Sequence, residues 1–311
     1  MSAKDKLIER ISTVEITLQL PQLINQGAGG VNAPNNKSAT LLRKGLGIVI
    51  FNILEDFLKE RTIEMFLSIS SSLTSFSNLP NEMREAATLG ALKGLVHRAT
   101  LEKKTQGDWM SLVQVEALNI NSTSLVNGFT ISPFSLMSEG SNVYPDDLIK
   151  AMKCLNIEGG WGTLQKISSL CNGGVLDLKQ SFHNISSRRH KAAHVANFDY
   201  EHGWLTEAVT EIFAIASSFD MALSARSDEL LANPAIALSK CEVHDKLSLR
   251  FLVYNAQKNY YSERKGTPLA RTIKNWANLS QAIQTIVPRC KLNNERLIIL
   301  NSQSRIEGWH C

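Results

Sequence analysis

Two long apolar stripes at helical spacing constrain the fold of this chain more than any other feature of its sequence. One runs from Ser38 to Arg61 and the other from Trp204 to Leu223. Apolar residues recur in them every three or four positions, which predicts helices that bury one broad face against other helices. The first stripe contains Leu42, Leu46, Val49, Ile50, Ile53, Leu54 and Phe57. We therefore predict a mainly α-helical body.

The last part of the chain has a different pattern. Between Leu247 and Tyr254, apolar residues alternate with other residues as in a half-buried strand. Two further strands are expected at Leu297–Leu300 and Arg305–Trp309, and Pro268–Val287 fits a single helix. The sequence thus predicts a small α+β module at the C-terminal end.

These patterns divide the chain into three predicted regions. Residues 1–37 are expected to form an N-terminal helix and linker, residues 38–230 a helical domain, and residues 240–311 a basic α+β module. Within the helical domain, Asn119–Ser141 is rich in serine, asparagine and glycine, which predicts an irregular excursion between helices.

Positive charge is concentrated in the C-terminal region. The whole chain of 311 residues has a net charge of +4, and residues 240–311 hold 12 Lys and Arg against 5 Asp and Glu. A basic appendage of this kind suits an anionic partner such as nucleic acid, although a requirement for solubility produces the same pattern.

The remaining composition indicates a cytoplasmic protein that does not associate with a membrane. Met1–Leu20 carries charges throughout and lacks the apolar core of a signal peptide, and the apolar stretch Leu46–Leu58 is too short to cross a bilayer. The five cysteines are scattered without a Cys-x-x-Cys pair. Ordinary reduced thiols are therefore expected, rather than a disulfide scaffold or a zinc knuckle.

Residues that carry chemistry are concentrated between Ser181 and Asn197, at the junction of two predicted helices. His190 and His194 are four positions apart, so on a helix they share a face and are spaced to bind one metal ion. A zinc protease would have glutamate in place of Lys191, which makes metal binding the less favoured interpretation. A second interpretation is structural: a basic helix end stabilised by the helix dipole and by water.

Cleavage of RNA is the third interpretation of this cluster. Arginine binds phosphate with a planar, always protonated group, and histidine titrates near neutral pH and moves protons. The ribose 2′-hydroxyl can then attack the adjacent phosphorus without a metal ion. Arg189 and His194 are five positions apart, about 140° around an ideal helix. A single straight helix therefore does not bring these side chains together well, whereas two copies of the chain across a two-fold axis can.

The segment from Arg189 to His194, RHKAAH, resembles the R-x4-6-H signature of the HEPN superfamily, in the form with a polar residue directly after the arginine. The flanking segments also resemble parts of these domains: Leu41–Phe66 the first core helix, Asn142–Trp161 the piece before the motif in the RiboL-PSP-HEPN subgroup, and Trp204–Leu223 the closing helix. The resemblance covers Ser38 to Ser227.

This resemblance implies a four-helix, up-and-down bundle that forms a homodimer with its motifs face to face. It further implies a metal-independent endoribonuclease, without a cofactor, that acts as a toxin or an antiviral defence effector. Arg189 would bind the phosphate, His194 would act as general base or acid, and His190 would orient the pair or the substrate. RNA is the implied substrate, and an antitoxin or another defence-system protein is an implied partner.

The resemblance leaves three points open. Arg188 also satisfies the spacing to His194, so either arginine can be the working one. Glu55 or Asp56 is a candidate to brace an arginine from a neighbouring helix, and an ordinary solvated carboxylate is the alternative. Some members of the superfamily lack nuclease activity, so the alternative function is a non-catalytic binding or scaffold subunit of a defence or toxin-antitoxin system.

Basic and aromatic residues are interleaved in the C-terminal module, which suits stacking on unpaired bases and contact with phosphates. The alternative is a solvated strand edge and helix face. The candidate nucleic-acid-binding residues are Lys258, Tyr260, Tyr261, Arg264, Lys265 and Arg271.

Overall fold

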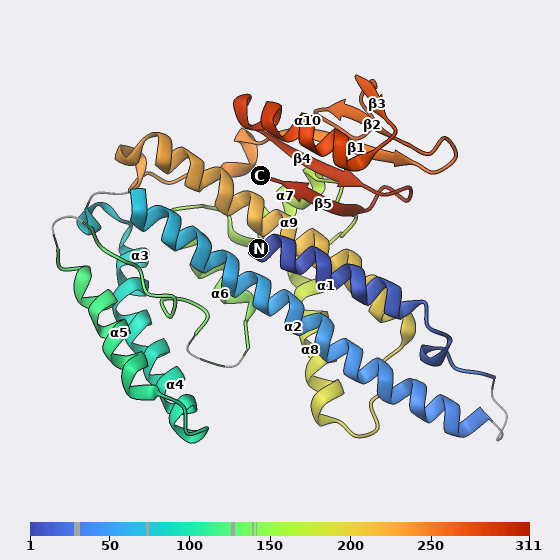
Figure 1. The fold of residues 1–311 in the computed structure, drawn as a ribbon, viewed down its shortest axis with the longest axis horizontal. Coiled ribbons are helices and arrows are strands. Elements are labelled where there is room, and N and C mark those ends of the chain that lie inside the picture. Colours follow the sequence, from blue (N-terminus) through green and yellow to red (C-terminus); the bar gives the residue numbers. More distant parts are fainter. Residues whose placement is uncertain (28–31, 73–74, 126–127, 139, 141) are drawn as a thin grey trace. The chain divides into compact units, whose positions relative to one another are not determined.

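The computed structural model describes residues 1–27, 32–72, 75–125, 128–138, 140 and 142–311 (Figure 1). Parts of two predicted segments, at residues 28–31 of the linker and at 126–127, 139 and 141 of the irregular excursion, lie outside these ranges. The chain forms two compact units: unit 1 contains residues 1–57, 164–218 and 247–311, and unit 2 contains residues 58–163 and 219–246. The predicted regions, residues 1–37, 38–230 and 240–311, are drawn from composition along the chain. They remain a prediction.

Unit 1 contains the helices that carry the sequence cluster. It is built from α1 (Ala3–Leu18), the first part of α2 (Ala33–Ser72), most of α7 (Gly160–Leu170), α8 (Leu178–His194) and the first part of α9 (His202–Ala232). In its core the rings of Phe51 in α2 and Phe182 in α8 meet edge to face, with centroids 5.8 Å apart. The predicted mainly helical body is confirmed.

Helix α2 is longer than its predicted stripe at both ends. It begins at Ala33, where Pro34 is accepted in the first turn, so Ser38 lies inside the helix. It continues beyond Arg61 because Met65, Phe66 and Ile69 extend the buried face. Leu42 and Val49, expected in the core, are about half exposed, at 49% and 48%. The buried face is therefore narrower than the apolar pattern suggests.

The C-terminal part of unit 1 is the predicted α+β module. Its elements are β1 (Ser248–Asn255), β2 (Tyr260–Lys265), β3 (Lys274–Trp276), α10 (Leu279–Leu292), β4 (Glu295–Leu300) and β5 (Ile306–His310). They form a mixed five-stranded sheet in the order β3-β2-β1-β4-β5, in which β1 and β4 are parallel and the other pairs antiparallel.

The predicted helix over Pro268–Val287 is wrong in its first half. Residues 274–276 form β3, and α10 begins only after Asn278, whose side chain caps the helix by accepting a hydrogen bond from the Gln281 backbone N–H. The strand β2 was not predicted, because its sequence YYSERK does not alternate between apolar and polar residues.

Both faces of this sheet are covered within unit 1. Helix α10 packs on one face, over a core cluster of Leu252, Trp276, Ala282, Ile286, Cys290, Leu297 and Ile299. On the other face the Trp309 ring meets Phe57 of α2 and Phe213 of α9 edge to face, each at a centroid distance of 6.3 Å. The module therefore shares its hydrophobic core with α2 and α9, the two helices that also contact α8.

Unit 2 is also mainly helical. A nearly continuous helical rod consists of α3 (Asn81–Glu85), one π-helical turn (Ala86–Gly90) and α4 (Ala91–Lys104). It is followed by α5 (Trp109–Ser122) and α6 (Pro145–Cys154), with Pro145 in the first turn as expected. Since α5 reaches Ser122, the predicted excursion from Asn119 starts a turn later than expected.

Among the described residues, α9 is the helix that is long and apolar enough to cross a membrane. In its most apolar window, 83% of the residues are buried inside the protein, as in the core helix of a soluble protein.

Candidate functional site

Helix α8 places the sequence cluster at its C-terminal end. The helix starts at Asp177, whose carboxylate accepts a hydrogen bond from the Gln180 N–H, and it ends at His194, since Val195 is extended. Lys44 of α2 donates hydrogen bonds to the carbonyls of Val195 and Ala196, at 2.9 and 2.6 Å. The basic side chain satisfies carbonyl groups at the helix end and fixes the end of α8 to α2.

The connection from α8 to α9 is also anchored by α2. Arg43, whose side chain is almost fully buried, donates to the Tyr200 carbonyl and pairs with Asp199 at 2.8 Å. The ring of Tyr200 lies so close to Gly47 that a methyl group there would overlap it. These contacts make the end of the motif helix a fixed part of unit 1.

Arg188 faces the protein. Its Cζ lies 4.7 Å from the ring centroid of Trp204 at the start of α9, a cation–π contact. It also attracts the carboxylate of Glu211 and the phenol of Tyr200 electrostatically. This ambiguous arginine is therefore held by α9.

A cluster of buried polar atoms surrounds Arg188. Burial raises the pKa of the Glu211 carboxyl, and a hydrogen bond from Ser181 and the charge of Arg188 only partly oppose this rise. Burial likewise raises the pKa of Tyr200 to about 12. Arg188 Nη1, Tyr200 Oη and Glu211 Oε2 are buried without a hydrogen-bond partner among the described residues. The carboxylate paired with the motif helix is thus Glu211, which sequence reasoning missed.

Arg189 is half-buried at the edge of the core-facing side of α8, and its Nε is buried without a hydrogen-bond partner in the described part of the chain. Ile185 and Ala192, on neighbouring turns of the same side, are buried. Because the side chain is only half-buried, the accessible part of this always charged guanidinium can bind an anion.

His190 and His194 lie together on the exposed side of α8. Their ring centroids are 4.7 Å apart with an angle of 50° between the planes, as expected for positions i and i+4. The continuous helix separates Arg189 from His194 by about 140°. A single chain therefore brings the two histidines together and does not bring Arg189 to His194.

Two further expectations concern metal ions and the supporting carboxylates. In the described ranges, a group of three side chains that could bind a metal ion occurs at Glu242, His244 and Asp245 of unit 2, with ligand atoms within 4.8 Å of one another, and not at the histidines of α8.

Of the two carboxylates proposed to brace an arginine, Asp56 pairs with Arg10 of α1 at 2.8 Å. Glu55 is buried in α2, 5% exposed.

The candidate nucleic-acid-binding residues do not form one surface. Tyr261 packs against the core under α10, and its ring lies 4.9 Å from that of Tyr254. Successive residues of β2 point to opposite faces, so Tyr260 and Arg264 lie on the face away from Tyr261 and Lys265. The residues therefore divide between the two faces of the sheet.

Two of the basic candidates in the module are already engaged. Lys265 pairs with the buried Glu295 at 2.7 Å, and Arg264 donates to the Pro268 carbonyl. Lys258 and Arg271 are exposed. The cations most accessible to a phosphate are thus those two.

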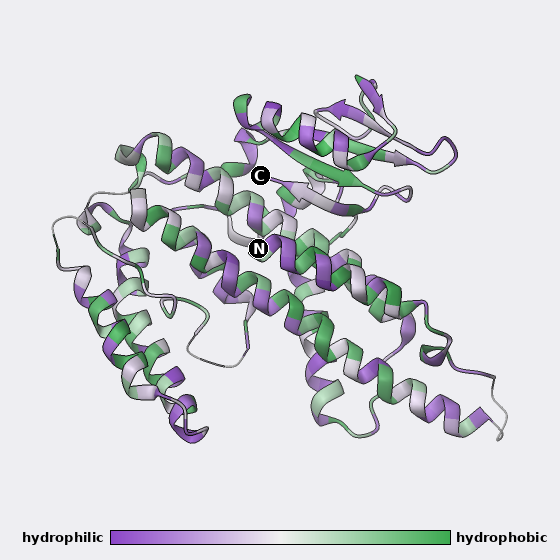
Figure 2. Ribbon diagram, in the orientation of Figure 1, coloured by the Kyte–Doolittle hydropathy of each residue, from purple (hydrophilic) through white to green (hydrophobic). Residues whose placement is uncertain are grey.

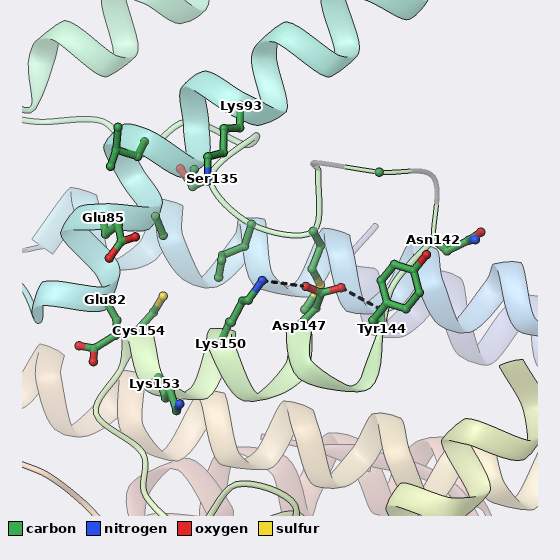
Figure 3. Close-up of a pocket in the computed structure, with 16 residues that line it drawn as sticks. Glu82, Glu85, Lys93, Ser135, Asn142, Tyr144, Asp147, Lys150, Lys153 and Cys154 are labelled. Atoms are coloured by element: carbon green, nitrogen blue, oxygen red, sulfur yellow. Dashed lines mark hydrogen bonds and ion pairs between the residues drawn. The ribbon is translucent and has the colours of Figure 1, made fainter.

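A separate pocket of about 560 Å³ lies within unit 2, between the π-helical turn and α6 (Figure 3). Its charged side chains carry both signs, and Asp147 pairs with Lys150 at 3.7 Å. Asp147 also accepts a hydrogen bond from the Tyr144 backbone N–H at the start of α6. The charged lining residues are Glu82, Glu85, Lys93, Asp147, Lys150 and Lys153. The sequence contains no motif that marks this pocket.

No protein-family model, curated protein or solved structure matches the chain. The family assignment and the roles of the α8 residues consequently rest on the residues themselves and are proposals.

Proposed function

We propose that this chain is a HEPN-type, metal-independent endoribonuclease that works as a cytoplasmic homodimer, as a toxin or a defence effector. The observation that carries the proposal is the end of α8. A half-buried arginine with an unpartnered Nε and two closely spaced, exposed histidines lie there within six residues. Arginine and histidine are the two groups that metal-free phosphodiester cleavage requires.

The proposed chemistry uses two copies of α8. Arg189 of one chain binds the non-bridging phosphate oxygens and stabilises the charge that develops on them. A neutral His194 of the other chain takes the proton of the ribose 2′-hydroxyl, the 2′ oxygen bonds to phosphorus, and the bond to the 5′ oxygen breaks. The same His194, now protonated, gives this proton to the leaving oxygen. His190, whose ring centroid lies 4.7 Å from that of His194 in the same chain, orients His194.

The proposed fold is the up-and-down HEPN bundle, with α2, α8 and α9 among its core helices. Support comes from the contacts that join these helices, namely Phe51 with Phe182, Lys44 with the end of α8, and Arg188 with Trp204. In this proposal Arg189 is the working arginine, because Arg188 is occupied by Trp204 and Glu211.

RNA cleavage by the purified chain in EDTA tests the proposed function. Cleavage should persist, leave 2′,3′-cyclic phosphate ends, and be lost in Arg189→Ala and in His194→Ala. Lys191→Ala is the matched control, since Lys191 is an exposed cation between the two motif residues and has no assigned role. Activity that survives both motif changes would refute the site.

Expression in cells separates the enzyme from the alternative scaffold function. Growth arrest that His194→Ala relieves supports the enzyme. Equal tolerance of the two forms, together with absent RNA cleavage in vitro, supports a non-catalytic binding subunit.

A further inference from the structure

An apolar groove of about 560 Å³ lies between α4 and α5, which run side by side as a hairpin in unit 2 (Figure 1). A second hollow on α4 shares Leu92, Val96 and Thr100 with it, so the apolar surface continues over α4. The groove is lined by Leu92, Leu95, Val96, Ala99, Thr100, Lys103, Trp109, Val113, Ala117, Ile120 and Asn121.

The apolar side chains of this hairpin are unusually exposed. Leu92 is 47% exposed and Val96 is 66% exposed, and Figure 2 shows hydrophobic residues along both helices. Contiguous apolar surface of this kind on a folded protein typically marks a site of interaction.

The opposite side of α4 already has its packing partner. Gly94 lies against the backbone carbonyl of Phe134 so closely that a side chain would overlap it, and Gly90 meets the carbonyl of Ser135 in the same way. Position 94 is about 160° around the helix from position 96. The groove side is therefore a separate face, and α5 is fixed independently by Glu116, which accepts a hydrogen bond from the Ser132 hydroxyl at 2.7 Å.

The charges at the groove have one sign. Lys103 lines the groove and lies 5.4 Å from the Trp109 ring centroid, and Lys93 lines the adjoining hollow. None of the residues that line either hollow is acidic. An occupant with an apolar ridge and acidic edges would complement this surface.

Shape and charge together select one kind of occupant. A ridge of side chains on a helix fits a groove between two helices, whereas a lipid surface is better matched by a convex apolar face. A second copy of the same hairpin would bring Lys93 and Lys103 against like charges. We propose that the α4–α5 groove binds an amphipathic helix of a partner protein whose apolar stripe is flanked by acidic residues.

The proposed helix would lie along α4. The 14 residues of α4 span roughly 21 Å at 1.5 Å per residue, which accommodates a partner helix of about four turns. Apolar residues at helical i, i+3, i+4 and i+7 spacing would contact Leu92 and Val96 from α4 and Trp109 and Val113 from α5.

A designed peptide provides the probe. It has about 15 residues, leucine at the stated spacing and glutamate on both edges, and a second peptide has lysine in place of each glutamate. Binding to the full-length chain is measured by calorimetry. The variants are Val96→Asp and its matched control Leu118→Asp, since Leu118 is equally exposed, at 70% against 66%, but does not line the groove.

The glutamate peptide should bind the native chain and Leu118→Asp alike, and Val96→Asp at least about tenfold more weakly. The lysine peptide should bind the native chain more weakly, and Lys93→Glu should narrow the difference between the two peptides, because it replaces one of the two lysine charges by a negative charge. Absent peptide binding, or equal binding by the two aspartate variants, would overturn the proposal. Concentration-dependent self-association would instead assign the groove to a second copy of the chain, if Val96→Asp removes it and Leu118→Asp does not. Binding to phosphatidylglycerol vesicles with the same dependence on Val96 would assign the groove to a lipid surface.

Discussion

Arg188 of α8 lies over the indole ring of Trp204, with its Cζ 4.7 Å from the ring centroid, and this contact joins the motif helix to the start of α9. It distinguishes the two arginines that satisfy the motif spacing. Each arginine has one buried guanidinium nitrogen without a hydrogen-bond partner among the described residues, so the contact of Arg188 with Trp204 is what sets it apart from Arg189.

The first prediction follows from this difference. Arg188→Ala should lower the free energy of unfolding by roughly 1–2 kcal/mol, because it removes a partly buried cation–π contact and the charge beside Glu211. Arg189→Ala should lower it less but abolish RNA cleavage. Urea unfolding and a cleavage assay on both variants check this. A stable, inactive Arg188→Ala together with an active Arg189→Ala would exchange the two roles.

Glu211 gives a prediction for pH. Burial raises the pKa of its carboxyl above the ordinary 4.5, so the folded state binds the proton more tightly than the unfolded state. The stabilising contribution of this group is complete below 4.5 and is lost as the pH rises through the folded pKa. Glu211→Gln, which is neutral, should therefore raise the melting temperature at about pH 7, and the gain should vanish below about pH 4.5.

Thermal unfolding between about pH 4 and pH 8 measures the effect. Glu201→Gln is the control, because Glu201 is an exposed carboxylate directly before the same helix and is not among the charges that shift the Glu211 pKa. Glu211→Gln with a melting temperature equal to or below that of the native chain at neutral pH would be the contrary result.

Two glycines in α2 provide a test of the packing beneath the motif. Gly47→Ala places a methyl group in the ring of Tyr200 and should cost about 1–3 kcal/mol of stability, whereas Gly45 has open space around it. Gly45→Ala should raise stability by about 0.5–1 kcal/mol, because alanine favours the helix. Urea unfolding of the two variants gives the comparison, and equal effects would contradict the position of Tyr200.

RNA binding by the C-terminal module should depend on its exposed cations. A Lys258→Ala, Arg271→Ala double variant should bind single-stranded RNA more weakly and with a smaller dependence on salt. Lys265→Ala should leave RNA binding near native, because Lys265 already pairs with Glu295. Filter binding over a range of salt concentrations distinguishes the variants. An equal loss in both would show that Lys265 reaches the RNA.

The sequence predicts the helical body and, in the module, strands β1, β4 and β5, because the apolar periodicity of these segments is strong. The stripe before Phe57 and the run from Trp204 locate α2 and α9, and alternation locates β1. The strand β2 has no such signal, since the buried Glu263 in it pairs with Arg250 and Arg289 and accepts a hydrogen bond from Trp276 Nε1. A buried ionic network makes a core strand look polar.

The candidate site is predictable only in part for a similar reason. The histidine pair follows from helical spacing, and the motif arginines follow from their chemistry. The role of Glu211 depends on which helix packs against Arg188. Residue spacing within a single segment carries no information about that packing. The run from Trp204 to Leu223 contains three carboxylates, Glu207, Glu211 and Asp220, so the sequence alone does not single out Glu211.

The central claim is that one working site combines Arg189 of one chain with His194 of another. The most direct measurement mixes Arg189→Ala chains with His194→Ala chains, each inactive alone, under conditions that exchange subunits. Half of the dimers are then mixed, and each mixed dimer has one of its two sites intact, so RNA cleavage should return to about one quarter of the native rate. Mixtures that stay as inactive as the separate variants, although mixed dimers form, would contradict the composite site.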